Sequence, residues 1–455
     1  MKELLTLALT GIFTMLADMF DLRKLVFPLA LFGLAMTISW SIYDWDLHQK
    51  IYGMMEIDNY ALAFIVVLCA TTLLWFIMSE DYFANMRAVT DRYALVFFSL
   101  AGALCMVSYT NVVMLFVGIE ILSVSMYVLA GSNKSDMASN ESAFKYFLMG
   151  AFASGFLLFG IALIYGATGT FDILAIRSGI GELSNNSLTS VGIIMIIIGM
   201  GFKIGAAPFH FWTPDVYQGA PTPITAFMAT VVKTAAVAAM FRLFIICFPS
   251  MSDVWQNIFA AMIVLTLLSG NVIAVMQHDA KRMLAYSSIS HAGYMLFSIF
   301  LSNGDSDNTI LFYTVAYSLA SMIGFTVLYL VQKARGTTSM SAFHGLGKSN
   351  PFLAFAMTLA LLSMAGIPPL AGFMAKYYVF ANAFEQGFIG LVLFAIVMSL
   401  VGVYYYFKII IAMFLHEDTE GGKVNADSLQ TLLLVICSIG LILLGVLPNL
   451  VYNIL

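Results

Sequence analysis

The most constraining feature of this 455-residue sequence is a series of long apolar runs that recur from one end to the other. A helix needs about 20 mostly apolar residues to cross a bilayer, because the hydrocarbon core is about 30 Å thick. Only 10% of the residues are charged, whereas a soluble domain carries about 25%. The sequence therefore predicts an all-α polytopic membrane protein with about 14 transmembrane helices. The predicted spans are 4–20, 25–43, 60–79, 92–108, 110–131, 142–166, 188–211, 221–247, 256–277, 280–302, 309–332, 352–381, 387–414 and 429–452.

Lysine and arginine residues outside the spans set the predicted orientation, because cytoplasmic loops are enriched in positive charge. The even number of spans places both termini on one side. If that side is outward, only four basic residues fall outside, namely Lys2, Lys50, Arg177 and Arg242. Eleven fall inside, namely Arg23, Lys24, Arg87, Arg92, Lys134, Lys281, Arg282, Lys333, Arg335, Lys348 and Lys423. The bias predicts a multi-pass protein with both termini periplasmic.

Six charged side chains lie inside the predicted spans when those near span ends, such as Arg92, Arg242, Lys281 and Arg282, are counted with the loops, and these six mark the functional part of the sequence. They are Glu120, Lys145, Lys203, Lys233, Lys376 and Lys408. A charge at the bilayer centre costs about 2.5–3.5 kcal/mol on insertion scales, so such residues usually serve a function. A lysine near the end of a span can instead extend its ammonium group to the membrane surface, and this alternative stays open for Lys408.

Two spans contain sequence that disrupts a helix at mid-depth, GFKIGAAPF at 201–209 and SMAGIPPLAGFMAK at 363–376. Proline removes a backbone hydrogen bond, and in hydrocarbon the freed carbonyls need protein or water partners. A broken helix that carries a lysine therefore predicts an internal hydrated cavity. A simple proline kink packed against its neighbours is the alternative.

The embedded lysines also indicate an internal repeat. Lys203 and Lys376 lie 173 residues apart, and the lysines that follow them, Lys233 and Lys408, lie 175 apart. These offsets predict two five-helix repeats, spans 4–8 and 9–13, each with a discontinuous helix, and the odd number of spans makes the repeats inverted. The predicted regions are a three-span N-terminal region at 1–91, the repeats at 92–247 and 256–414, and a C-terminal loop and last span at 415–455.

Proton movement is the chemistry that these residues suit best. A desolvated lysine has a lowered pKa and a nearby carboxylate raises it again, so a lysine–glutamate pair whose separation changes can bind and release a proton. Glu120 could form such a pair with Lys145 or Lys203. His291 lies among hydroxyl side chains in KRMLAYSSISHAGYML and is a candidate shuttle near neutral pH. A structural histidine bonded to a backbone carbonyl is the alternative.

Other polar residues narrow the function classes. His210, Trp212 and Asp215 lie near the predicted inner surface, where they suit either interface anchoring or a cytoplasmic proton entrance. The sequence has no nucleotide-binding glycine loop, and its four cysteines lie in apolar runs without metal-ligand spacing. The net charge of −5 gives no indication of a nucleic-acid partner.

Five motifs resemble the antiporter-like membrane subunits of respiratory NADH–quinone oxidoreductase (complex I), and the form WTPDVYQGAP resembles the subunit N branch in particular. The motifs are VGIEILSVSMYVLAG, GFKIGAAPFHFWTPDVYQGAPTPITAFMATVVKTAAVAAMFRLF, KRMLAYSSISHAGYML, SMAGIPPLAGFMAKYYVF and GVYYYFKI. They occur in the order of the family between about residues 110 and 410.

The resemblance implies a proton-translocating subunit and gives roles to individual residues. Glu120 matches the glutamate of the fifth span, Lys145 the lysine of the sixth, and Lys203 and Lys233 those of the seventh and eighth. Lys376 matches the lysine of the broken twelfth span, where the related subunit M carries a glutamate. Lys408 keeps the basic character of the thirteenth span.

The resemblance also implies what lies outside this chain. NADH, FMN, iron–sulphur clusters and quinone are expected in partner subunits, and the neighbours would be subunit M and small subunits such as K, in a bacterial inner membrane. One alternative is a subunit of a multisubunit cation/proton antiporter or of a membrane-bound hydrogenase, because these share the fold. Another is a scaffold subunit whose charges no longer act.

Overall fold

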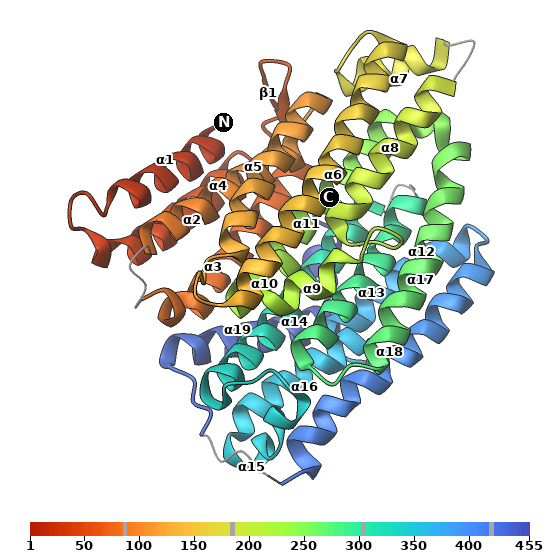
Figure 1. Cartoon of the computed structure of the whole chain (residues 1–455). Helices are drawn as coiled ribbons and strands as arrows, with labels where there is room; N and C mark the ends of the chain where they lie inside the picture. The colour runs from red at the N-terminus through yellow and green to blue at the C-terminus, as the bar shows by residue number, and fades with distance from the viewer. Residues whose placement is uncertain (85–88, 183–186, 302–305, 418–422) are drawn as a thin grey trace.

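A bundle of long helices makes up most of the computed structural model, which describes residues 1–84, 89–182, 187–301, 306–417 and 423–455 (Figure 1). Twelve helical stretches within these residues are long and apolar enough to cross a membrane. Eleven are α2 (Val26–Tyr43), α3 (Asn59–Ala84), α4 (Val89–Ser108), α5 (Val112–Ala130), α6 (Met137–Thr168), α8 (Ser187–Ile204), α12 (Ser252–Val275), α13 (Ala280–Leu301), α14 (Ser306–Arg335), α18 (Ile389–Leu415) and α19 (Ser428–Val446). The twelfth joins α10 (Thr222–Phe227), the π-helical η2 (Met228–Val232), α11 (Lys233–Arg242) and the π-helical η3 (Leu243–Cys247).

The other two predicted spans are also helical. The first is α1 (Lys2–Leu16), which packs against α2 and α4. The other is divided into α16 (Pro351–Ala365) and α17 (Ala371–Glu385). The all-α prediction is thus confirmed. Short elements complete the described chain: η1 (Arg23–Leu25), β1 (Gln49–Ile51), β2 (Met55–Ile57), α7 (Ile173–Glu182), α9 (Trp212–Gly219), η4 (Pro249–Met251), η5 (Met340–Phe343), α15 (Leu346–Ser349) and α20 (Asn449–Tyr452).

The first break separates α8 from α9. The helix ends at Ile204 because Gly205 takes a left-handed conformation, with φ +72°, and the Ala207–Pro208 peptide that follows is cis. The polar backbone exposed by the break finds protein partners, as burial requires. The Trp212 indole donates to the Phe202 carbonyl at 2.9 Å, and the Ala207 amide donates to Thr266 Oγ1 at 2.9 Å.

The second break, between α16 and α17, is built in a similar way. Gly366 is left-handed, with φ +86°, and the Pro368–Pro369 peptide is cis. The Gly372 amide donates to the Ser363 side chain at 3.0 Å. The predicted interruptions at mid-depth are therefore real breaks with paired backbone, rather than kinks in continuous helices.

Lys203 and Lys376, whose similar spacing suggested the repeat, do not occupy equivalent positions at the two breaks. Lys203 lies in the last turn of α8, before the first break, whereas Lys376 lies in the second turn of α17, after the second break. The offsets of 173 and 175 residues therefore do not mark matched sites, and the repeat has to be argued from the two broken helices themselves.

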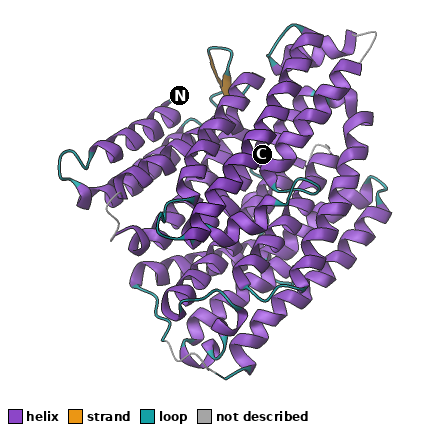
Figure 2. Cartoon of the chain, viewed as in Figure 1, coloured by secondary structure: helices purple, strands orange, loops and turns teal. Residues whose placement is uncertain are grey.

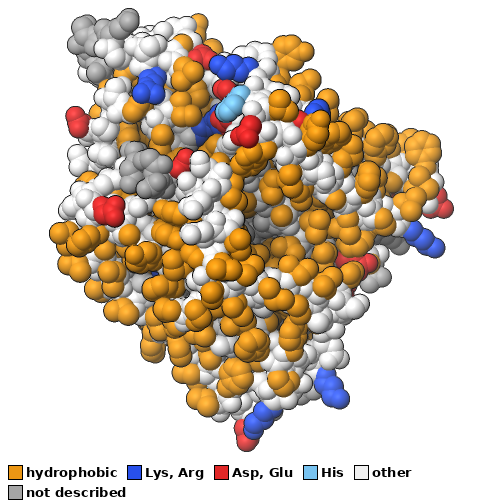
Figure 3. Space-filling model, turned by 180° about the vertical axis from the view of Figure 1, so that it is seen from behind, with side chains coloured by type: hydrophobic (Ala, Val, Ile, Leu, Met, Phe, Trp, Pro, Cys, Tyr) orange, Lys and Arg blue, Asp and Glu red, His pale blue; other side chains and the backbone are white. Residues whose placement is uncertain are grey.

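Three loops that the predicted topology places on the outer side of the membrane lie next to one another. The β1–β2 hairpin pairs with the α4–α5 loop through Met55 and Tyr109, and Asn111 pairs with Asp172 before α7. Figure 2 shows this hairpin as the strand structure beside the N-terminus, and Figure 3 shows a largely hydrophobic surface with charges toward its edges. Arg87, which contributed to the charge bias, lies outside the described residues.

The predicted orientation can be tested with thiol labelling, since all four native cysteines are buried. Tyr52, at the hairpin, is 90% exposed and Asn140, at the start of α6, is also exposed. We expect Tyr52→Cys to react with a membrane-impermeant maleimide added from the periplasmic side and Asn140→Cys to be protected until the membrane is permeabilised. The reverse pattern would overturn the orientation.

Candidate functional site

Helix α13 forms the polar centre of the bundle. It packs against α9, α11, α12, α14, α17 and α18, and nearly all of its residues are buried. Nevertheless it carries Ser287, Ser288, His291 and Tyr294, all of them buried. Buried polar side chains are costly without partners, so their contacts with neighbouring helices define the site.

Lys203 and Glu120 lie close together but are not in direct contact. The Lys203 ammonium donates to Ser123 Oγ at 2.7 Å and lies 5.6 Å from the centre of the Tyr146 ring. Glu120 accepts a short hydrogen bond from the Ser154 hydroxyl of α6. Ser123 is one helical turn from Glu120 on α5. The two charged groups are therefore separated, an arrangement we call the open pair, and a hydroxyl group binds each of them: Ser123 binds Lys203 and Ser154 binds Glu120.

Lys145 does not pair with Glu120. Its ammonium lies 2.7 Å from Glu141 and 2.9 Å from Asp215, and its side chain is 38% exposed. Arg282 binds the other oxygen of Asp215 at 2.9 Å. Of the two partners that the sequence left open for Glu120, the structure therefore does not favour Lys145. Lys145 belongs to a polar pocket of about 320 Å³ at the helix ends.

Lys233 is the first residue of α11, directly after the π-helical segment η2. The ammonium donates to both the carbonyl and the hydroxyl of Ser288 on α13 through short bonds. It is also 6.0 Å from the centre of the Tyr317 ring. The side chain is 2% exposed, so Lys233 is held in the interior by hydroxyl and carbonyl oxygens.

His291 continues this polar line along α13. Its Nδ1 lies 2.9 Å from the Tyr313 hydroxyl and its Nε2 lies 3.3 Å from the Tyr406 hydroxyl. Tyr406 also bonds to Ser287. The imidazole is therefore paired with two phenols, and the alternative of a histidine bonded to a backbone carbonyl is not what the structure has. A small cavity of about 10 Å³, lined by His291 and Tyr313, lies beside it, about the size needed for one water.

Lys376 reaches back across the second break. Its ammonium donates to the Ala365 carbonyl, at the end of α16, at 2.9 Å and to Ser399 Oγ at 2.8 Å. It also lies 4.8 Å from the centre of the Tyr294 ring. Helix C-termini favour cations, and Lys203 likewise lies at the C-terminal end of its half-helix. The approach is close, because a Cβ on Gly366 would lie 2.9 Å from the Lys376 side chain.

Lys408 lies at the end of another helix. Its ammonium donates to the carbonyls of Val275 and Gln277 at 3.0 and 3.1 Å, where α12 ends. This contact caps the C-terminus of α12. The Lys408 side chain is half-buried.

The residues of the WTPD segment are divided between packing and the polar pocket. Trp212 is buried and stacks on Tyr146 with ring centres 4.7 Å apart. His210 is buried and stacks on Phe211 at 4.6 Å. Asp215 holds Lys145 and Arg282, so it is the residue of this segment that can take part in a polar entrance.

Several partners of the charged residues were not identified from the sequence, namely Ser123, Ser154, Ser399 and Tyr406. Ser123 had a usable signal, because it follows Glu120 by three residues and therefore shares its helix face. The others come from helices distant in sequence. Among the described residues, no group of three or more His, Cys, Asp or Glu side chains could hold a metal ion.

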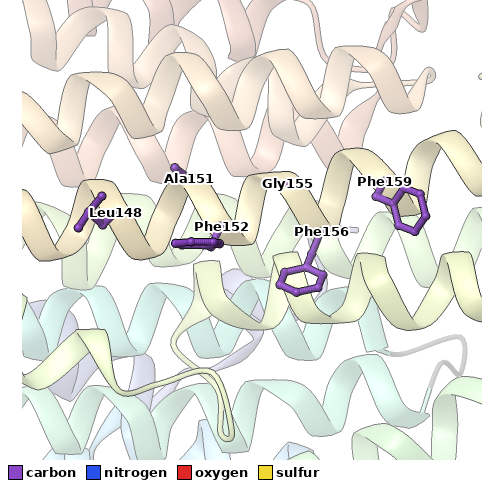
Figure 4. A pocket seen from close by; sticks show the side chains of 6 residues that line it. All are labelled: Leu148, Ala151, Phe152, Gly155, Phe156 and Phe159. Atoms are coloured by element: carbon purple, nitrogen blue, oxygen red, sulfur yellow. The ribbon is translucent and has the colours of Figure 1, made fainter.

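The molecule also has an apolar pocket of about 460 Å³ on α6, which Figure 4 shows from close by. Its lining residues are Leu148, Ala151, Phe152, Gly155, Phe156 and Phe159. The side chains drawn there are carbon only, and they carry no group that could bind a proton. None of the polar residues of α13 is among its lining residues.

Comparisons with known proteins agree with this architecture. Residues 110–402 match the family model described as NADH:quinone oxidoreductase/Mrp antiporter, transmembrane. A relative named NADH-quinone oxidoreductase subunit N from Cytophaga hutchinsonii is 41% identical over 100% of this chain and 99% of its own length. A chain of respiratory complex I from Thermus thermophilus superposes with a TM-score of 0.87 at 33% identity, covering 99% of this chain and 98% of that one. A chain of the Mrp complex from Dietzia sp. DQ12-45-1b has a TM-score of 0.90 at 20% identity, with 99% and 95% covered, and shows a shared fold.

Proposed function

We propose a specific proton path through this chain, which belongs to the NADH:quinone oxidoreductase and Mrp antiporter transmembrane family. The full-length relatives named subunit N identify it as a proton-translocating membrane subunit of NADH:quinone oxidoreductase, in which quinone reduction takes place elsewhere in the complex. What remains to be assigned is which side chains carry the proton.

The path runs from the Glu120–Lys203 pair through Lys233 to His291 and Lys376. This path is supported by the line of buried polar side chains on α13, which connects Lys233 to Lys376. Both lysines are bound by neutral oxygens, Lys233 by Ser288 and Lys376 by Ser399 and a carbonyl. Such partners stabilise an ammonium less than a carboxylate does, which favours groups that alternate between charged and neutral forms. Waters bridge the remaining gaps, since neighbouring helices are about 8–10 Å apart.

Lys145 and Lys408 take positions at the ends of this path. Lys145, with Asp215, forms part of the polar pocket that opens at the ends of α6 and α9. Lys408 fixes the end of α12 beside α18, which carries Tyr406. Both are assigned to the relay as supporting groups near its ends, with regions 92–247 and 256–414 as two inverted five-helix units.

The surroundings of the chain follow from the same proposal. NADH, FMN, the iron–sulphur clusters and quinone are bound by other subunits, and antiporter-like subunit M and small subunits such as K are the neighbours in a bacterial inner membrane. The termini face the periplasm. The likeness to the Mrp complex at 20% identity supports the fold alone, so a cation/proton antiporter remains the less supported function.

Glu120 provides the direct test of the first pair. We expect Glu120→Ala to lower NADH-driven proton uptake into inverted membrane vesicles by about tenfold or more, since a positioned proton-transfer group contributes roughly 10²–10⁴-fold. Glu120→Asp keeps the carboxylate on a shorter arm and should lose less.

The control for Glu120 is Glu385→Ala, which removes an exposed carboxylate at the end of α17. Complex assembly is compared by blue-native electrophoresis. If Glu120→Ala and Glu385→Ala pump equally well in equally assembled complexes, Glu120 has no part in the path.

A further inference from the structure

A fourth buried lysine, Lys281, has no place in the path described so far. Its place at the start of a predicted span suggested a loop residue on the inner side, but Lys281 lies in the first turn of α13 and is only 2% exposed. Its ammonium donates to the carbonyl of Gln218 at 3.1 Å and, through a short bond, to that of Ala220. Among the described residues, no carboxylate lies within ion-pair distance of it, because Arg282 takes Asp215 instead.

Lys281 lines an open polar pocket of about 480 Å³. The walls include Asp136, Thr222, Gln332, Lys333 and Thr338. The Lys333 side chain is 57% exposed, so this pocket, which we call the vestibule, reaches the surface on the face predicted to be cytoplasmic. A buried cation at the inner end of a polar vestibule is in position to exchange protons with its water.

The vestibule is connected inward by the last turn of α9. Tyr217, which is 1% exposed, lies near the Ser288 side chain, while the adjacent Gln218 carbonyl accepts from Lys281. Ser288 lies seven residues after Lys281 on the same face of α13, a rise of about 10 Å. Ser288 in turn holds the Lys233 ammonium.

We propose that Lys281 is the entry residue of the path, receiving protons from vestibule water and passing them by Tyr217 and Ser288 to Lys233. This inference rests on the proposed function, because it supplies the lysine that the relay needs to recharge. In each cycle the Lys281 ammonium gives a proton to the hydroxyl line, neutral Lys233 takes one up from Ser288, and Lys281 is reprotonated from the vestibule. One proton has then moved from the vestibule to Lys233, which becomes charged and returns to its neutral form when it passes a proton on toward His291 and Lys376.

The competing role of Lys281 is a fixed cap on α9, since cations stabilise helix C-termini. Arginine separates the two roles. It keeps the charge and can donate to both carbonyls, but it hardly deprotonates in a protein. A cap would survive Lys281→Arg, whereas a proton carrier would not.

The experiment compares Lys281→Arg, Lys281→Ala and Tyr217→Phe in the assembled complex, with NADH-driven proton uptake and quinone reduction measured in inverted vesicles. Lys134→Ala, which removes an exposed lysine on the same face, is the control. We expect Lys281→Arg to lower proton uptake as far as Lys281→Ala, by about tenfold or more, while assembly stays normal. Wild-type pumping by Lys281→Arg would show that the residue is only a cap.

A second measurement does not depend on changing Lys281. Thr338→Cys places a thiol in the vestibule, and Ala334→Cys places one on the exposed surface of α14 outside it. We expect a cationic methanethiosulfonate reagent to inhibit proton uptake in the first variant only. Equal rates in both after complete modification would exclude entry through the vestibule.

These outcomes can be told apart from failure of the relay itself. If Lys281→Arg pumps normally while Lys203 variants do not, the entry assignment is wrong and the path described above stands. If Lys203→Arg also pumps normally, the lysine relay is wrong as a whole.

Discussion

Replacing Lys203 by arginine is expected to stop proton translocation nearly as completely as replacing it by alanine. In the structure the Lys203 ammonium is held by Ser123 Oγ at 2.7 Å, with Glu120 one turn away and bonded to Ser154. This open pair lets the lysine release a proton, and closing it would favour the charged form. An arginine would keep the charge in either arrangement, because its guanidinium stays protonated.

The measurement is proton uptake in inverted vesicles beside the quinone-reductase rate of the same membranes. We expect both Lys203 variants to lose about tenfold or more of proton uptake. Asn140→Ala, at the exposed start of α6, serves as the matched control. Full pumping by Lys203→Arg would mean that the residue acts only as a fixed charge that shapes the interior.

The arrangement of spans was predictable because a bilayer imposes a simple rule on the sequence. Helix α13 was expected at 280–302 and is found at Ala280–Leu301. The two breaks were predictable from glycine and proline. Their geometry was not, because the predicted span 188–211 contained a disrupting segment at 201–209 without a defined helix end, and the structure ends α8 at Ile204, where Gly205 turns left-handed.

The partners of the charged residues were harder to predict, because they depend on which helices meet. Lys145 was left open beside Lys203 as a partner for Glu120, although Glu141, four residues before Lys145, offered a local partner at helical spacing. Its second partner, Asp215, comes from α9. Lys281 was misjudged for the same reason. Its position at the start of a span indicated a loop, but the carbonyls that bind it belong to residues about 60 positions earlier in the chain.

Each of the two broken helices carries a buried lysine close to its break. At the first break Lys203 belongs to the half-helix whose C-terminal end it occupies, and at the second Lys376 reaches that end from the following half-helix. The Lys376 ammonium faces the partial negative charge of the α16 C-terminus, whereas the Lys203 ammonium is bound by Ser123 of α5. Both are therefore stabilised by neutral groups rather than by a permanent ion pair, which leaves each free to exchange its proton.

Lys376 and Lys203 act in series if the proposed path is correct, and a double-mutant cycle can show it. Alone, Lys376→Ala should lower proton uptake by about tenfold or more, as expected for a proton-transfer group. When two residues belong to one path, removing either already blocks proton transfer, so the losses of proton uptake are far from additive. The variant with both lysines replaced by alanine should then pump no worse than the poorer single variant.

The cycle requires that each variant assembles, and Lys376→Arg supplies a check. Its guanidinium can still donate to the Ala365 carbonyl and so preserve the cap on α16, while removing proton release. If Lys376→Arg assembles but does not pump, the loss belongs to proton transfer rather than to folding. Two independent paths, one through each broken helix, would instead leave each single variant with the proton flux of the other path, and only the double variant would stop pumping.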